Sequence, residues 1–140
     1  DSADDVACSD QWVRIHRGCY KFVTEEEHWS AALEHCRTIG GDLTTIQSWK
    51  EKEEIQKYLA TEIPDTLKWW VGLQRNKTSD GAWKWIDNND LDSNVIPWSN
   101  SDLKTRPGEL CGYVDMATTK LQFTVTRCSA NYPFICEYHS

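Results

Sequence analysis

Six widely spaced cysteines constrain the fold of this 140-residue chain more than any other feature. Their number is even, and none belongs to the Cys-x-x-Cys pairs that are typical of zinc ribbons and thioredoxin-like redox sites. This pattern predicts three disulfides and an oxidising, extracellular compartment, and it leaves the pairing open. The cysteines are Cys8, Cys19, Cys36, Cys111, Cys128 and Cys136.

The composition predicts a single globular domain. Hydrophobic residues make up 39% of the chain and charged residues 26%, which is typical of a folded protein and not of a disordered one. The net charge of −7 disfavours binding to nucleic acid or anionic lipid, because both require a basic face. No apolar run is long enough to span a bilayer. We expect one domain over residues 8–138, preceded by a polar leader at residues 1–7 that lacks the pattern of a signal peptide.

A hairpin and a first helix are predicted near the amino terminus. Residues 12–13 and 19–23 have the pattern of two short strands joined by a glycine-containing turn. Thr24 and Glu27 match a capping box, which predicts that a helix begins there, and Gly40-Gly41 predicts its end. The apolar stripe expected on this helix consists of Trp29, Ala32, Leu33 and Cys36.

A second helix is predicted to follow, also with defined ends. Ser48 and Glu51 form another capping box, and Pro64 lacks a backbone donor, so the helix is expected to end before it. Trp49, beside the helix start, is the tryptophan expected to be exposed among the eight in the chain. The apolar face of this helix is expected to carry Ile55, Tyr58 and Leu59.

From residue 69 onward the apolar residues recur in short runs and alternations, which predicts strands. Residues 87–110 are polar and irregular, and a loop of that length inside a compact domain is usually functional. Helices first and strands afterwards predict an α+β fold. The predicted strands are 69–73, 83–86, 111–114, 121–126 and 134–138, with a turn at 78–81.

Two short motifs accompany the cysteines. Trp70-Val71-Gly72-Leu73 precedes the long loop, and Pro133-Phe134-Ile135-Cys136-Glu137 lies near the end of the chain. Together with the order of the cysteines, they resemble the core motif and the closing strand of a C-type lectin-like domain of the long form. The resemblance covers residues 8–138. It implies two helices packed on antiparallel sheets, a ligand site on the loop at residues 87–110, and the disulfides Cys8–Cys19, Cys36–Cys136 and Cys111–Cys128.

Sugar-binding members of that family hold a calcium ion in the long loop, and the resemblance allows its ligand positions to be compared with this chain. Asp102-Leu103-Lys104 replaces a proline-containing triplet, which keeps one carboxylate but adds an ammonium group. Glu109 matches the family glutamate two residues before the next cysteine. Phe123-Thr124-Val125 replaces a Trp-Asn-Asp triplet and offers one hydroxyl group. Because calcium takes roughly six to eight oxygen ligands, the sequence disfavours calcium, and we expect no cofactor.

Two other segments have partial metal-site patterns. The auxiliary calcium position of the family would place its first acid around Arg75 and its second around Ser79 or Asp80. Asp90, Asp92 and Asn94 copy the first three ligand positions of an EF-hand, but the later glycine and acid are missing. A turn rich in Asx residues is therefore the favoured interpretation.

The sequence favours a recognition module over an enzyme, because it contains no nucleophile elbow and no glycine-rich phosphate loop. We expect a secreted or extracellular member of the C-type lectin-like family that binds a protein ligand or receptor, without calcium, through the long-loop face. The alternative is a calcium-dependent carbohydrate-binding lectin with a degenerate site, and a structural module that acts through oligomers is a third possibility. The candidate contacts are Asn100, Asp102, Lys104, Arg106 and Glu109, and Asn76 begins a possible N-glycosylation sequon.

Overall fold

The computed structural model describes residues 8–75, 83–92, 94–100 and 108–139. These residues form two helices and eight strands. Both helices precede β4, and the described elements from β4 onward are all strands, which confirms the predicted α+β class. The elements are β1 (Val13–Ile15), β2 (Gly18–Glu27), α1 (Trp29–Thr38), β3 (Asp42–Leu43), α2 (Trp49–Glu62), β4 (Lys68–Arg75), β5 (Trp83–Trp85), β6 (Leu110–Asp115), β7 (Gln122–Arg127) and β8 (Tyr132–Tyr138).

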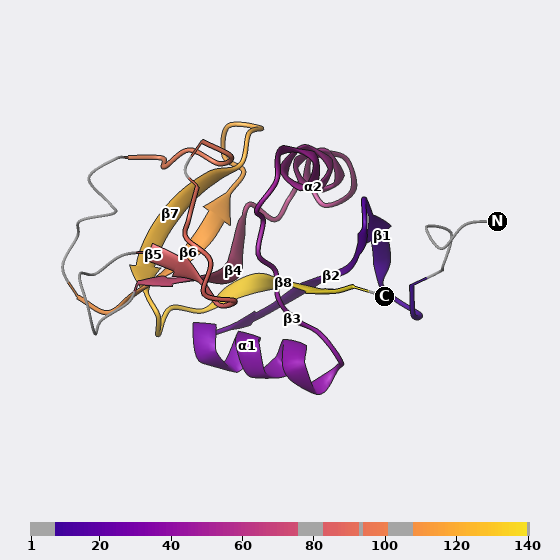
Figure 1. Ribbon diagram of the computed structural model, residues 1–140, viewed down its shortest axis with the longest axis horizontal. Helices are drawn as coiled ribbons and strands as arrows, with labels where there is room; N and C mark the ends of the chain where they lie inside the picture. The colour runs from indigo at the N-terminus through magenta and orange to yellow at the C-terminus, as the bar shows by residue number, and fades with distance from the viewer. Residues whose placement is uncertain (1–7, 76–82, 93, 101–107, 140) are drawn as a thin grey trace.

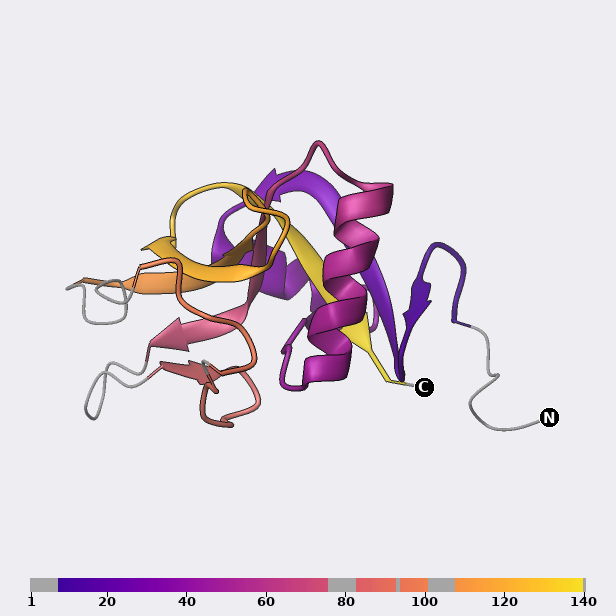
Figure 2. The same cartoon turned by 90° about the horizontal axis from the view of Figure 1, so that it is seen from above.

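The strands form one twisted sheet in the order β1-β2-β8-β4-β6-β7, with β3 paired to β8 and β5 paired to β4. All pairings are antiparallel except that of β4 with β8, where Trp70 lies beside Phe134. The two helices lie on opposite sides of the sheet (Figure 1). Seen from above, β5, β6 and β7 lie at one end of the molecule, while β1 and the carboxyl terminus lie at the other (Figure 2).

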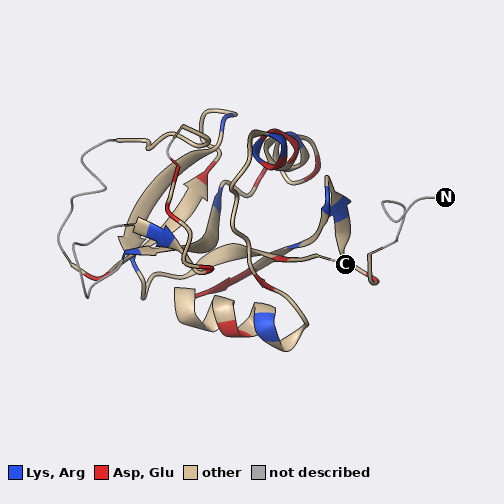
Figure 3. Ribbon diagram, in the orientation of Figure 1, with Lys and Arg blue, Asp and Glu red and all other residues tan. Residues whose placement is uncertain are grey.

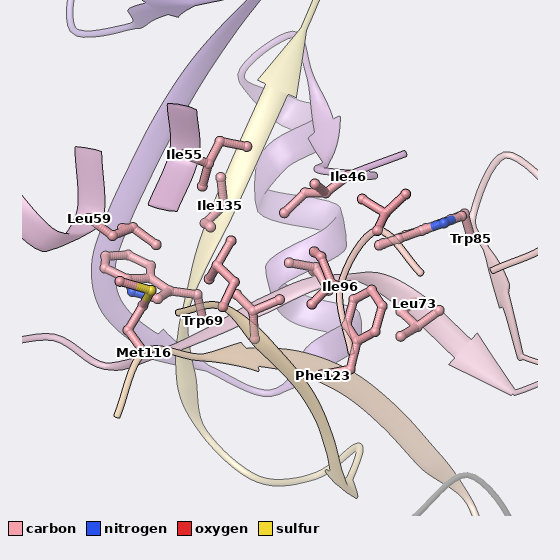
Figure 4. Close-up of a cluster of buried hydrophobic side chains, with 14 of the residues drawn as sticks. Ile46, Ile55, Leu59, Trp69, Leu73, Trp85, Ile96, Met116, Phe123 and Ile135 are labelled. Carbon is pink, nitrogen blue, oxygen red and sulfur yellow. The ribbon is translucent and has the colours of Figure 1, made fainter. Parts of the chain in front are cut away.

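The main hydrophobic core lies between α2 and the sheet (Figure 4). Ile55 and Leu59 of α2 are 0% and 1% exposed, which confirms the face predicted for this helix. Residues from the long loop reach the same core, since Ile96 is fully buried. The labelled side chains that point toward one another are Ile46, Ile55, Leu59, Trp69, Leu73, Trp85, Ile96, Met116, Phe123 and Ile135.

A second cluster of buried side chains packs beneath α1 and includes Trp29, Ala32, Cys36, Trp70 and Phe134. Beside this cluster, Gly72 of the Trp-Val-Gly-Leu motif lies very close to residues of neighbouring segments. A Cβ atom on Gly72 would lie 2.9 Å from Cγ1 of Ile86 and 3.2 Å from the Leu43 carbonyl oxygen. Only glycine fits there without a shift of its neighbours.

The ends of α2 agree with the sequence prediction. Ser48 is the N-cap, and its Oγ accepts a hydrogen bond from the Glu51 backbone N–H at 3.2 Å. The Glu51 carboxylate accepts the Ser48 hydroxyl in turn, also at 3.2 Å. The helix ends at Glu62, two residues before the proline. Trp49 is 58% exposed, as predicted.

The predicted start of α1 is wrong. Residues 24–27 belong to β2, which continues as far as Glu27 and pairs there with Tyr132 of β8. The helix begins only at Trp29, and its N-cap is His28, whose Nδ1 accepts the backbone N–H of Ala31 at 3.2 Å. Pairing with a distant strand therefore outweighs the local capping signal. The predicted end at Gly40-Gly41 is confirmed, since Gly40 follows the C-cap with a φ of 95°.

Three disulfides connect the sheet, the first helix and the loop end. Cys8–Cys19 joins the residues before β1 to β2, Cys36–Cys136 joins α1 to β8, and Cys111–Cys128 joins β6 to the residue after β7. These are the pairings that the family resemblance implies. The last of them lies next to the end of the long loop.

Candidate functional site

The first part of the long loop is a series of turns closed by its own side chains. The Asp87 carboxylate accepts the Asn89 backbone N–H at 3.1 Å, and the Asp92 carboxylate accepts the Asn94 N–H at 2.9 Å. Gln47, which precedes α2, donates to the Asp87 carboxylate at 2.7 Å and accepts from the Asn89 side chain at 3.0 Å. These contacts anchor the turn to the start of α2.

The segment with a partial EF-hand pattern is occupied by these turns and by an ion pair. The Lys84 ammonium of β5 lies 2.8 Å from the Asp90 carboxylate. Asp92 caps a turn, as the Asx-rich interpretation predicts. Among the described residues, no group of three or more His, Cys, Asp or Glu side chains is arranged to hold a metal ion.

The middle of the loop is fixed to the edge of the sheet. The Phe123 backbone N–H donates to the Pro97 carbonyl, and the Ser99 N–H donates to the Phe123 carbonyl, both at 2.8 Å. Trp98 thus pairs with β7 in parallel, and its ring packs 5.4 Å from Trp83 and 5.6 Å from Phe123, measured between centroids. Residues 97–99 therefore act as a short extension of the sheet.

Strand β7 has one buried and one more accessible face. Phe123 is 0% and Val125 3% exposed, and both pack in the main core. Thr124 points to the other face, where it lies opposite Tyr113 of β6 in the strand pairing, and burial raises the pKa of that tyrosine. The alternation predicted for this strand is confirmed, and its backbone and side chains are engaged in packing and pairing.

The end of the loop is joined to β4 by an arginine. The Arg75 guanidinium donates to the Gly108 carbonyl, and its central carbon lies 5.8 Å from the centroid of the Trp83 ring. Gly108 has a φ of 109°, a conformation that favours glycine. Glu109, which follows, is exposed and leads into β6.

A cavity of about 470 Å³ lies beside this junction. Apolar and polar side chains both line it, with Trp85, Leu110 and Trp29 among the apolar ones. Charges of both signs occur on both helices (Figure 3). The polar lining residues are Ser30, Gln74, Arg75, Lys84, Asn88 and Glu109.

The predicted contact residues divide into two groups. Asn100 and Glu109 belong to the described residues, and both are exposed. Asn100 follows the residues paired with β7, and Glu109 precedes β6. Asp102, Lys104 and Arg106 lie outside the described residues, as do Asn76 and the predicted turn at 78–81.

A buried carboxylate that the sequence analysis did not single out lies on β8, in a pocket that Asp87 at the start of the long loop also lines. Glu137 is 6% exposed, and its Oε1 accepts the Thr44 hydroxyl at 2.5 Å and the Thr45 backbone N–H at 2.8 Å. Its Oε2 lies 2.7 Å from Nε2 of His139. Burial raises the pKa of Glu137, and the two hydrogen bonds from the threonines oppose that rise. This group ties β8 to the segment before α2.

Among the residues that the structure describes, those at the ligand positions do not fit the calcium site that the family resemblance implies. Where two oxygen-bearing side chains are needed, Thr124 offers one hydroxyl group and Val125 lies in the core. Where the auxiliary ion needs an acid, Arg75 places a cation. Glu109 alone of the described ligand positions keeps a suitable carboxylate.

Comparison with known proteins agrees with this fold. A family model for the lectin C-type domain matches residues 25–138. Rheacalcin-2 of Rhea americana is 28% identical, and the match covers 97% of this chain and 99% of that protein. Asialoglycoprotein receptor 1 of Rattus norvegicus is 26% identical over 96% of this chain, which spans only 46% of the receptor.

A solved structure shows the same architecture. Human lithostathine superposes with a TM-score of 0.80, covering 96% of this chain and 92% of that one, at 20% identity. Within the part of the chain that the structure describes, no helix is long and apolar enough to cross a membrane. With its three disulfides, its sheet topology and the family match over most of its length, the chain belongs to the C-type lectin domain family.

Proposed function

We propose that this domain recognises a protein ligand through its long-loop face, outside the cell and without calcium. C-type lectin domains are recognition modules that are commonly extracellular, and they typically bind ligands without catalysing a reaction. The finer proposal concerns which ligand this domain binds and whether the interaction needs a metal ion. The burial of Phe123 and Val125 in β7 is the observation that carries it.

The side chains at the three compared positions of β7 offer too few oxygen ligands for a calcium ion. A calcium ion that bridges a protein and a sugar needs oxygen atoms from several side chains at once. In this chain the β7 positions supply a phenyl ring and an isopropyl group to the core, and only one hydroxyl group. Bringing Val125 to the surface would also break the pairing of β7 with β6. The cost of rearranging a packed strand therefore opposes metal binding here.

Two contacts that need no metal ion hold the loop to the sheet, one at residues 97–99 and one at Gly108. Residues 97–99 are paired with β7, and Gly108 is bonded to Arg75. Because residues 97–99 and Gly108 are already held, ordering them on ligand binding costs less conformational entropy, which favours affinity. The candidate contacts, which lie between these supports or directly beside Gly108, carry both charges and an amide, a mixture suited to polar contacts across a protein interface. They are Asn100, Asp102, Lys104, Arg106 and Glu109.

A cell-binding experiment tests the proposal. Fluorescent tetramers of the domain are applied to a panel of cells in EDTA and in calcium, before and after treatment with protease or with glycosidases. The variants Lys104→Glu and Arg106→Glu reverse loop charges. Lys57→Glu is the matched control, because it reverses an exposed charge on α2.

We expect binding that persists in EDTA, disappears after protease treatment, survives glycosidase treatment, and is weakened by the loop variants but not by the control. Binding that requires calcium and is abolished by glycosidases would contradict the proposal. It would support the alternative, a carbohydrate-binding lectin with a degenerate site.

A further inference from the structure

Arg75 makes two contacts with parts of the chain that lie near the loop end. From the last position of β4, its guanidinium donates to the Gly108 carbonyl, across 33 positions of sequence. The same group lies over the Trp83 ring, at 5.8 Å from the centroid. Trp83 is 8% exposed and belongs to the main core, so it is a rigid support. The arginine thus connects the loop end to a fixed point of the core.

The contact between Arg75 and Gly108 lies where the long loop joins β6. Gly108 immediately precedes Glu109, and β6 begins at Leu110. A hydrogen bond that fixes the Gly108 peptide restricts the backbone direction at Glu109, and so the direction in which its side chain can point. Glu109 and Arg75 also line the same cavity. Arg75 therefore controls the position of a candidate contact residue without needing to touch the ligand.

We infer that Arg75 is a positioning residue that replaces a bound metal ion: its side-chain cation holds the loop end against the sheet. The family resemblance would place the first acid of the auxiliary calcium site around Arg75. At that place the guanidinium itself binds the Gly108 carbonyl, and this contact needs no metal ion. The inference rests on the proposed function, because it explains how the loop face is set without calcium.

The chemistry selects arginine over lysine. A guanidinium is planar, so it can lie against an indole face while an N–H at its edge donates to a carbonyl. A lysine ammonium could donate to Gly108 but has no plane to lay over Trp83. Lysine at this position should therefore retain only part of the effect.

Hydrogen exchange of the intact domain, measured peptide by peptide in EDTA, tests the inference. The variants are Arg75→Ala and Arg75→Lys. Arg37→Ala is the control, since Arg37 makes an exposed ion pair with Asp42 at 3.0 Å. The peptides compared are residues 108–114, which contain the loop end and β6, and residues 49–62, which form α2.

For Arg75→Ala we expect exchange in residues 108–114 to become about tenfold faster, the effect of losing one charge-assisted hydrogen bond, while α2 keeps its protection. Arg75→Lys should show a smaller increase, and Arg37→Ala none in either peptide. Unchanged exchange in Arg75→Ala would overturn the inference, and so would equal acceleration in both peptides, which would indicate a general loss of stability.

A calcium arm separates this inference from the proposed function. Millimolar calcium should leave the exchange of Arg75→Ala unchanged. If calcium restored its protection, the calcium independence in the proposed function would be refuted while the clamping role of Arg75 stood. If Arg75→Ala behaved like the wild type in both buffers, the clamping role alone would be refuted.

Discussion

Substituting Val125 by aspartate restores the acid that the family's calcium-binding triplet carries, and the structure predicts severe destabilisation. Val125 is 3% exposed and packed in the main core. Losing its buried side chain costs about 1.5–3 kcal/mol. Burying a carboxyl group without a partner adds about 2–3 kcal/mol even when the group is protonated. The sum, about 4–6 kcal/mol, is comparable to the whole stability of many domains.

Urea unfolding in EDTA, followed by tryptophan fluorescence, measures this cost. Thr124→Asn is the matched control, because it restores the other triplet residue at a half-buried position and should cost about 1 kcal/mol or less. The double variant should remain as destabilised as Val125→Asp and should gain nothing from calcium. A Val125→Asp variant within about 1 kcal/mol of the wild type would refute the assignment of Val125 to the packed core.

Three further outcomes follow from the fold. Ser48→Ala should lower the unfolding free energy by about 1 kcal/mol through loss of the α2 cap, seen as a lower urea midpoint with an unchanged slope. Because burial raises the pKa of Glu137, the folded state binds its proton more readily than the unfolded chain does. The contribution of this carboxyl group to stability therefore falls as pH rises above its ordinary pKa of 4.5. Glu137→Gln should flatten that part of the profile of unfolding free energy against pH, and an unchanged profile would contradict this. Replacing Cys36 and Cys136 by alanine opens a loop of sequence separation 100 and should cost about 4–5 kcal/mol in calorimetry, whereas a loss below about 1 kcal/mol would argue against it.

The sequence predicts those parts of the fold in which both partners of an interaction lie close together in the chain. Ser48 and Glu51 are within one helical turn, so their pattern is enough to place the start of α2. Thr24 and Glu27 have a similar pattern, but β2 continues through them because β8, from the other end of the chain, pairs with it. The two-residue strand β3 was not predicted for the same reason, since it exists only by pairing with β8.

The same distinction holds for the candidate site: patterns within one short segment could be predicted, and contacts between distant segments could not. The spacing of Glu109 from Cys111 is enough to place it at the loop end, and the alternation in 121–126 is enough to predict a half-buried strand. The contact of Arg75 with Gly108 joins residues with no local pattern, so the sequence indicated only a misplaced cation at a metal position. Likewise, the burial of Glu137 depends on Thr44 and Thr45, which come from a distant segment.

Thermal unfolding in EDTA, against a calcium titration into the millimolar range, tests the central claim most directly. A ligand that binds only the folded state stabilises it by about 2.7 kcal/mol at 100 times its dissociation constant, which for a domain of this size raises the midpoint by roughly 10 °C. The account predicts superimposable transitions at every calcium concentration, with the loop face held by β7 and Arg75. A saturable rise of the midpoint with calcium would contradict it and would make the carbohydrate-binding alternative the better explanation.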